Sequence, residues 1–166
     1  MNSDPDVMRN FPRHLSPEES LAFIEKSTAM LAQEKYGYWA VEEKSTHDFL
    51  GFVALAEANF ESRFTPCIEI GWRLKKSAWG KGFASEGARK LLEYGFCSLN
   101  LGEIFSLTAK VNERSWRVME RIGMCRDFEN DFDHPRVAEG SHLRPHVLYR
   151  LTREDWQRHL GPPAQL

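Results

Sequence analysis

The sequence has no excess of charge of either sign. Its 22 lysines and arginines are balanced by 24 aspartates and glutamates, which gives a formal net charge of −2 over 166 residues. A protein that binds nucleic acid through the phosphate backbone normally presents a broad positive surface. We therefore expect no nucleic-acid partner.

Long apolar runs and a cysteine framework are also missing. No stretch approaches the roughly 18 apolar residues that a membrane-spanning helix needs, and the chain does not open with a basic and then apolar signal region. Its cysteines, Cys67, Cys97 and Cys125, are odd in number and far apart, which does not favour disulfide pairing. These absences predict a cytoplasmic protein without a membrane partner.

Apolar material, by contrast, is sufficient for one core. Hydrophobic residues make up 42% of the chain and aromatic residues 12%. A chain of this length and composition is typical of a single globular unit. We expect residues 1–166 to form one domain.

The local patterns indicate strands interspersed with helices. A capping box at Ser16-Pro17-Glu18-Glu19 predicts the start of a helix that Gly37 ends. Strands are predicted over 38–41, 49–58, 67–74, 103–111 and 146–151, and further helices over 84–99, 114–122 and 156–160, the last ended by Gly161-Pro162-Pro163. Residues 124–143 show no clear pattern. The order predicts a mixed sheet with helices packed on it, an α/β (α+β) fold.

A glycine-bearing loop joins the third predicted strand to the following helix. Gly80 and Gly82 flank Lys81 just before the helix begins, which would place backbone N–H groups at the positive end of a helix dipole. Such a loop can hold a phosphate, although two glycines also make an ordinary tight turn. The P-loop pattern fails at Gly82 and the dinucleotide-binding pattern fails at Ser85.

Three motifs around this loop resemble those of the GNAT acetyltransferases, with the RimJ/RimL-like branch as the nearest match. They are Glu69-Ile70-Gly71-Trp72-Arg73-Leu74, Trp79-Gly80-Lys81-Gly82-Phe83-Ala84-Ser85-Glu86, and Asn112-x-x-Ser115-x-x-Val118-Met119-Glu120-Arg121-Ile122-Gly123-Met124. The resemblance implies the GNAT fold, a mixed central sheet with helices on both faces. It also implies an acetyl-CoA co-substrate held between two splayed parallel strands, and an amine acceptor.

In the resembled family a strand and a short helix precede the stretch that matches residues 4–8, and this sequence begins almost at that stretch. Either the sequence starts later than in its relatives or, as we expect, the sheet lacks the family's first strand. A sheet without that strand has an open edge, which another chain can cover. We expect a homodimer on that ground.

The resemblance assigns the three motifs to the acetyl-CoA site. The family's loop pattern maps onto residues 77–82, where Ser77 replaces the usual glutamine or arginine. Backbone groups of Gly80, Lys81, Gly82, Phe83 and Ala84 would hold the pyrophosphate, Trp72 to Leu74 would hydrogen-bond the pantetheine arm, and Asn112 and Ser115 would reach the arm and the sulfur.

The resemblance also implies catalytic roles. Glu69 would act as the general base, usually through a water, with an ordinary solvated or ion-paired strand residue as the alternative. Many members carry a tyrosine as the acid seven residues after the motif asparagine, where this sequence has Met119. Ser115 is the expected substitute, unless it is an ordinary serine of a first helical turn.

The acceptor stays open at the level of sequence. A protein N-terminal amine and a small amine of the polyamine or aminoglycoside type both fit, and a catalytically impaired CoA-binding domain is the alternative outside enzymes. His134 lies in the segment without clear pattern, where we expect it to contact the acceptor. We expect no metal, because His142-x-x-x-His146 lacks the context of a zinc site.

Overall fold

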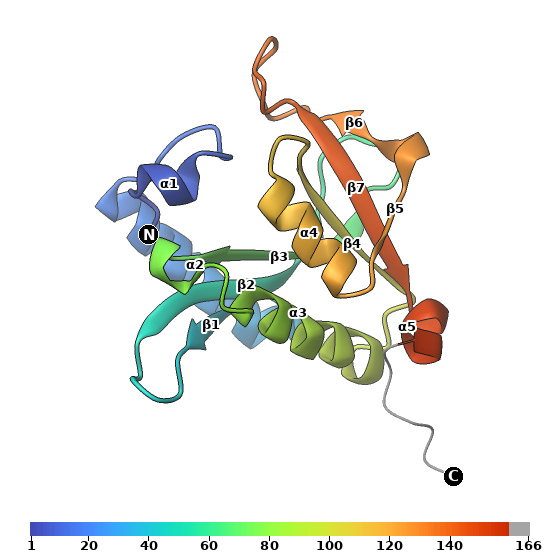
Figure 1. The fold of residues 1–166 in the computed structure, drawn as a ribbon, viewed down its shortest axis with the longest axis horizontal. Helices are drawn as coiled ribbons and strands as arrows, with labels where there is room; N and C mark the ends of the chain where they lie inside the picture. The colour runs from blue at the N-terminus through green and yellow to red at the C-terminus, as the bar shows by residue number, and fades with distance from the viewer. Residues whose placement is uncertain (160–166) are drawn as a thin grey trace.

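A seven-stranded mixed sheet organises the chain in the computed structural model, which describes residues 1–159 (Figure 1). The strands are β1 (Tyr38–Glu42), β2 (Phe49–Ala58), β3 (Cys67–Leu74), β4 (Glu103–Ala109), β5 (Cys125–Arg126), β6 (Phe132–Asp133) and β7 (Pro145–Thr152). Their order is β1-β2-β3-β4-β7-β5, with β6 also paired to β7. Only the β3–β4 pair is parallel. The predicted mixed α/β sheet is confirmed.

Helices cover both faces of the sheet. They are α1 (Pro5–Met8), α2 (Pro17–Glu34), α3 (Phe83–Glu93), α4 (Glu113–Arg121) and α5 (Arg153–His159). In Figure 1, α3 and α4 lie in front of the sheet and α2 lies behind it. The predicted capping box is present, since the Ser16 hydroxyl accepts from the Glu19 amide and the Glu19 carboxylate accepts from the Ser16 amide.

The main core lies between the sheet and the α3–α4 layer. Leu55, Ile70 and Ile104 from three neighbouring strands are fully buried there, against Leu92 of α3 and Ile122 near the end of α4. Each such side chain contributes roughly 1.5–3 kcal/mol when it leaves water. Because side chains alternate along a strand, the residues between these core positions point to the α2 face.

Several predicted boundaries differ from the structure. The helix predicted over 84–99 ends at Glu93 and continues as a π-helical turn over Tyr94–Ser98. In that turn a Cβ on Gly95 would come within 2.7 Å of the Ile104 side chain, so the turn packs directly on β4. The strand predicted to Val111 ends at Ala109, where a turn begins. The final helix was predicted to Leu160 with a stop at 161–163, which lies outside the described residues.

The segment without a sequence pattern contributes two short strands. β5 and β6 have two residues each and both pair with β7. Strands of that length are too short to show alternation, which explains why the sequence did not reveal them.

β1 forms the opposite edge of the sheet. Within residues 1–159 it pairs with β2 alone, and no strand precedes it in the sequence.

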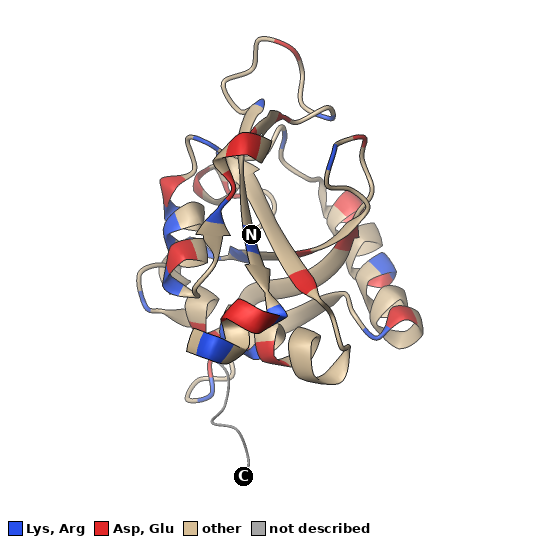
Figure 2. Cartoon of the chain, turned by 90° about the vertical axis from the view of Figure 1, so that its right-hand side faces the viewer, with Lys and Arg blue, Asp and Glu red and all other residues tan. Residues whose placement is uncertain are grey.

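Charged side chains are spread over the surface. Figure 2 shows acidic and basic positions interspersed along the helices at both sides of the molecule. Over residues 1–159, no helix is both long enough and apolar enough to cross a membrane.

Candidate active site

β3 and β4 separate soon after they meet (Figure 1). Their ladder pairing joins Glu69 to Phe105, and beside it the Ser106 hydroxyl donates to the carbonyl oxygen of Ile70 at 2.8 Å. Beyond that point β3 stays paired with β2 and β4 stays paired with β7. The two strands therefore open a wedge, which is lined on the β3 side by residues 71–74.

The glycine loop lies at the end of β3 and leads into α3. Gly80 and Gly82 have φ angles of +73° and +88°, which L side chains rarely adopt, and a Cβ at either position would meet nothing within 4 Å. Among the described residues, no side chain caps the N-terminus of α3. The first-turn N–H groups beside an open loop are suited to an anion. Lys81 is exposed there, and Phe83 and Ala84 are half-buried.

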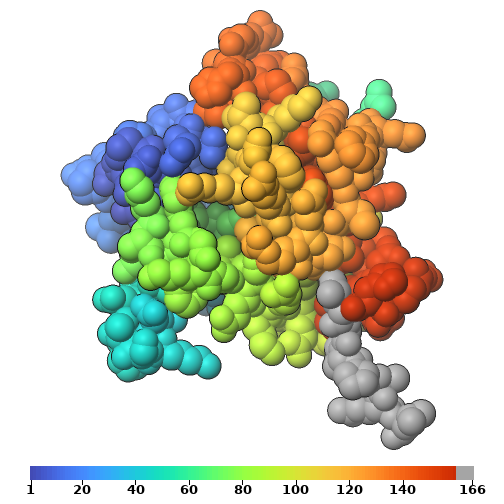
Figure 3. All heavy atoms as spheres, viewed as in Figure 1, coloured from blue at the N-terminus to red at the C-terminus, as the bar shows by residue number. Residues whose placement is uncertain are grey.

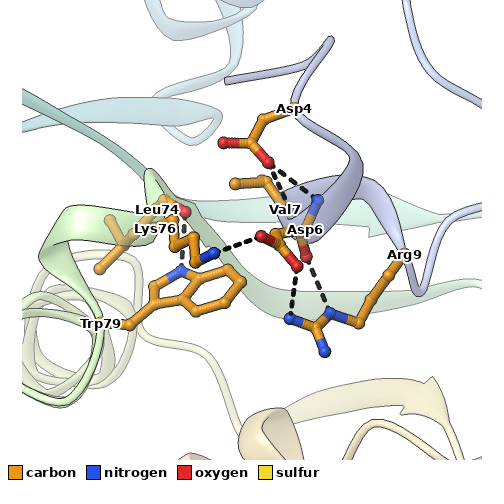
Figure 4. Close-up of polar contacts among 7 residues, drawn as sticks. All are labelled: Asp4, Asp6, Val7, Arg9, Leu74, Lys76 and Trp79. Carbon is orange, nitrogen blue, oxygen red and sulfur yellow. Dashed lines mark hydrogen bonds and ion pairs between the residues drawn. The ribbon is translucent and has the colours of Figure 1, made fainter.

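The Trp79 side chain connects this loop to the end of β3 (Figure 4). Its indole N–H donates to the carbonyl oxygen of Leu74 at 2.9 Å, so that carbonyl already has a partner. The guanidinium of Arg114, in α4, lies 4.6 Å from the centre of the Trp79 ring. On the other side, Lys76 pairs with Asp6 of α1 at 2.5 Å. In Figure 3 the light green loop meets α4 in yellow, with β3 in darker green behind them.

The N-terminus of α4 faces the same wedge. Asn112 donates its side-chain amide to the Thr108 hydroxyl at 2.9 Å, and its carbonyl oxygen accepts from the Ser115 amide at 3.0 Å. Ser115 is half-buried on the first turn. Met119, seven residues after Asn112, is only 1% exposed and belongs to the main core, so it offers no acid at this position.

Glu69 is half-buried at the point where the wedge begins. Burial raises the pKa of its carboxyl group to about 7, and a backbone hydrogen bond from Leu107 partly offsets this rise. Glu69 forms no ion pair with residues 1–159, which weakens the ion-paired alternative. A carboxylate with a pKa near neutrality is suited to general-base work.

His134 follows β6 and belongs to an aromatic cluster. Its ring lies 4.6 Å from Phe60 and 4.8 Å from His146. Burial, together with His146 and Arg136, lowers the pKa of His134 to about 4, so the ring is neutral at pH 7. Further rings connect it to Phe105, the strand partner of Glu69, through Phe132 and Phe64.

The sequence did not reveal a basic hollow beside α3. The hollow has a volume of about 680 Å³ and is lined by Lys81, Gly82, Ser85, Glu86, Arg89, Lys90, Leu92, Glu93, Arg121, Ile122 and Trp156. Arg89 donates to the carbonyl oxygen of Arg121 at 2.9 Å, which joins α3 to the end of α4. Arg89 follows Gly82 by two helical turns, and this spacing is the sequence signal that could have indicated a basic hollow beside α3.

The described part of the chain contains no group of three or more His, Cys, Asp or Glu residues placed to hold a metal ion.

Sequence comparison identifies the family. The model described as "Acetyltransferase (GNAT) domain" matches residues 1–125. The chain belongs to the GNAT acetyltransferases. Members of this family transfer an acetyl group from acetyl-CoA to an amine acceptor.

Two similar proteins are N-acetyltransferases by name. The FsC-acetyl coenzyme A-N(2)-transacetylase of Aspergillus fumigatus is 30% identical over 172 residues, covering 98% of this chain and 71% of that protein. The uncharacterized N-acetyltransferase YnaD of Bacillus subtilis is 30% identical over 155 residues, covering 93% of this chain and 85% of that protein.

Solved structures show the same fold. A GNAT-family acetyltransferase from Bacillus anthracis superposes with a TM-score of 0.73 at 27% identity, over 92% of this chain and 85% of that one. The spermidine N-acetyltransferase of Vibrio cholerae, in complex with CoA and spermine, superposes with a TM-score of 0.70 at 20% identity, over 93% and 87% of the two chains.

Proposed function

We propose that this protein is an acetyl-CoA-dependent N-acetyltransferase that acts on a primary amine in a ternary complex, with Glu69 as the general base. One observation carries the proposal: a carboxyl group whose pKa is about 7 lies where β3 and β4 begin to separate. The glycine loop and the start of α4 adjoin the same opening. On this view residues 1–166 act as one cytoplasmic domain.

The chain has the groups that acetyl-CoA would need. Backbone N–H groups of residues 80–84 would bind the pyrophosphate, because the loop is open and the helix N-terminus has no side-chain cap. Trp72 to Leu74 would bind the pantetheine arm along the free side of β3, and Asn112 would border it. The cations Lys81, Arg89 and Arg121 of the basic hollow would face the remaining phosphate of the nucleotide.

The acetyl transfer needs a base and an acid. Glu69 would accept a proton from the ammonium form of the acceptor, directly or through a water, as the nitrogen bonds to the thioester carbonyl carbon. A backbone N–H of β3 would stabilise the oxyanion. As the carbon–sulfur bond breaks, the nitrogen loses its second proton; Ser115 would donate its hydroxyl proton to the thiolate and take up this one, so that the hydroxyl is restored.

We place the protein in the RimJ/RimL-like branch on the resemblance of its three motifs. Solved structures of a ribosomal-protein-S5-alanine acetyltransferase and of a spermidine acetyltransferase share the fold at 18% and 20% identity. That identity supports the fold alone and leaves both a protein N-terminus and a small amine as acceptors. His134 would border the acceptor through its aromatic cluster.

Release of free thiol from acetyl-CoA tests the proposal. Peptides with free N-termini, polyamines, aminoglycosides and amino acids would be offered one at a time, and we expect release with at least one class. Thermal stabilisation by acetyl-CoA would be measured in parallel, since a ligand at 100 times its Kd adds about 2.7 kcal/mol. Stabilisation without thiol release on any amine would instead support a CoA-binding domain without turnover.

A further inference from the structure

A second charged residue shares the sheet face of Glu69. Glu69, Gly71 and Arg73 alternate along β3, so all three point to the α2 side. Gly71 pairs with Ala54 of β2, and Ala54 pairs with Tyr38 of β1. A Cβ on Gly71 would meet nothing within 4 Å, so the space above it is open. We call this space, bounded by Glu69, Arg73 and Tyr38, the Gly71 gap.

Arg73 has an unsatisfied polar group beside this gap. Its guanidinium lies 4.0 Å from the centre of the Phe11 ring and 5.4 Å from that of Phe52, and one terminal nitrogen donates to Asn2 at 3.0 Å. Its Nε–H is buried without a hydrogen-bond partner in the described chain. Aromatic rings stabilise a guanidinium through its flat face but leave its in-plane N–H groups free for an acceptor.

No carboxylate within residues 1–159 neutralises Arg73. Burial lowers the pKa of its guanidinium, and Tyr38 is the single group whose charge opposes this effect. Tyr38 in turn has its pKa raised by burial and then by Glu69, while Arg73 lowers it. Both charges therefore act on Tyr38, which the strand register places across Ala54 from Gly71. A half-buried cation without a counter-charge is unfavourable unless an anion joins it.

We propose that the acceptor amine carries a carboxylate, and that Arg73 binds this carboxylate while Glu69 faces the amine. This inference rests on the proposed acetyl transfer and narrows its acceptor to amino acids and related small zwitterions. The dimensions agree, because residues four apart on a strand are separated by roughly 13 Å, which leaves room for a small zwitterion between a carboxylate side chain and a guanidinium side chain. A polyamine would meet the positive charge of Arg73 instead.

Matched substrate pairs test this specificity. Free amino acids would be compared with their C-terminal amides, which have nearly the same shape but no negative charge. We expect kcat/KM for the acid to exceed that for the amide by about 10-fold or more, which is the usual contribution of a charge-assisted hydrogen bond. Arg73→Gln should reduce the acid-to-amide ratio of kcat/KM to about 1, and the turnover of the amide that remains shows that the variant is folded.

Two control variants separate recognition from packing. Arg73→Lys retains the charge and should keep part of the preference for the acid. Asn2→Ala removes the hydrogen-bond partner of the guanidinium and should leave the acid-to-amide ratio unchanged. Any one of three results would overturn this inference alone. The first is equal kcat/KM for acid and amide in the wild type, and the second is a preference for the acid that remains in Arg73→Gln. The third is turnover of spermidine and amides without turnover of acids. Absence of thiol release with every amine would overturn the proposed transferase activity as well.

Discussion

At the scale of single residues, the environment of Glu69 is the feature with the clearest chemical consequence. The carboxyl group is half-buried and no cation within residues 1–159 offsets this burial, so its pKa rises to about 7. A base must be deprotonated to act, and Glu69 therefore gains activity as the pH rises through this value. Ionisation of the same group is unfavourable in the folded state, which connects catalysis to stability.

We predict that kcat/KM rises with pH to about 7 and then levels off, because Glu69 is protonated and inactive below its pKa. Glu69→Gln should lower kcat by roughly 100-fold or more, the usual effect of losing a positioned base. Thiol release measured from pH 5 to 9 checks both statements. Glu57→Gln, an exposed change on β2, serves as the control. An unaltered pH profile in Glu69→Gln would assign the base to another group.

The same carboxyl group should make stability depend on pH. Its pKa is raised in the folded protein, so the folded state holds its proton more tightly and loses stability as the pH rises from about 4.5 to about 7. Glu69→Gln should therefore unfold at a higher denaturant concentration than the wild type at pH 8, by about 1–3 kcal/mol in free energy. At pH 4 the two proteins should be alike. A variant that is less stable than the wild type at pH 8 would contradict the buried placement.

Ser115 is expected to affect turnover more than binding. Ser115→Ala should lower kcat by about 10-fold or more while the Kd for acetyl-CoA changes little, because the hydroxyl acts on the leaving thiolate. Turnover kinetics and calorimetric binding of acetyl-CoA separate the two effects. Ser77→Ala, on the exposed turn before the glycine loop, should change neither. Equal losses of kcat and affinity in Ser115→Ala would assign Ser115 to binding alone.

At the scale of elements, the close contact of β2 with β3 holds the wedge open on one side. Gly51 pairs with Leu74, and its φ of +144° brings the two backbones together. A Cβ there would lie 2.2 Å from the carbonyl oxygen of Arg73 and 2.7 Å from the Cα of Leu74. The contact is with backbone and cannot be relieved by a rotamer change. The position of residues 71–74 therefore depends on a glycine at 51.

Gly51→Ala should thus destabilise the protein by about 3 kcal/mol or more, since the end of β3 would have to move. It should also weaken acetyl-CoA binding, because residues 72–74 line the wedge. Gly102→Ala is the matched control: it lies just before β4, and its Cβ would meet nothing within 4 Å. Chemical denaturation of the two variants provides the comparison. A loss of stability in Gly51→Ala no greater than that in Gly102→Ala would contradict this account of the contact.

At the scale of the whole molecule, the sheet has an unpaired edge at β1. Within residues 1–159, β1 is hydrogen-bonded to β2 alone, and an open edge strand is a template for pairing with another chain.

We predict a homodimer, which equilibrium sedimentation at micromolar concentration should show as a species near twice the chain mass of 19.2 kDa. A single species at the chain mass would remove this prediction.

Much of the fold could be predicted from local sequence. The alternation of apolar residues located β1 to β4 and β7, and Ser16 to Glu19 located the start of α2. β5, β6 and the π-helical turn could not be predicted. The two strands have too few residues to show a period, and in the turn Gly95 packs closely on Ile104, a contact with a residue of another element.

The residues of the candidate site also fall into those that could be predicted from the sequence and those that could not. Glu69, the glycine loop and the Asn112–Ser115 segment were named from motifs. Tyr38, the role of the Arg73 side chain and the basic hollow were not. A sequence motif describes only residues that lie close together in the sequence. The Gly71 gap is formed by residues on β1 and β3 that are brought side by side only through pairing with β2.

The sequence by itself therefore determined the family, the order of the main elements and the expectation that the loop from Trp79 to Ala84 binds phosphate, because each of these rests on local spacing. Tertiary structure alone decided three properties. It set the ionisation of Glu69, the lack of a counter-charge at Arg73 and the open space above Gly71. These properties depend on which distant side chains exclude water or supply charge, and only the folded sheet brings those side chains together.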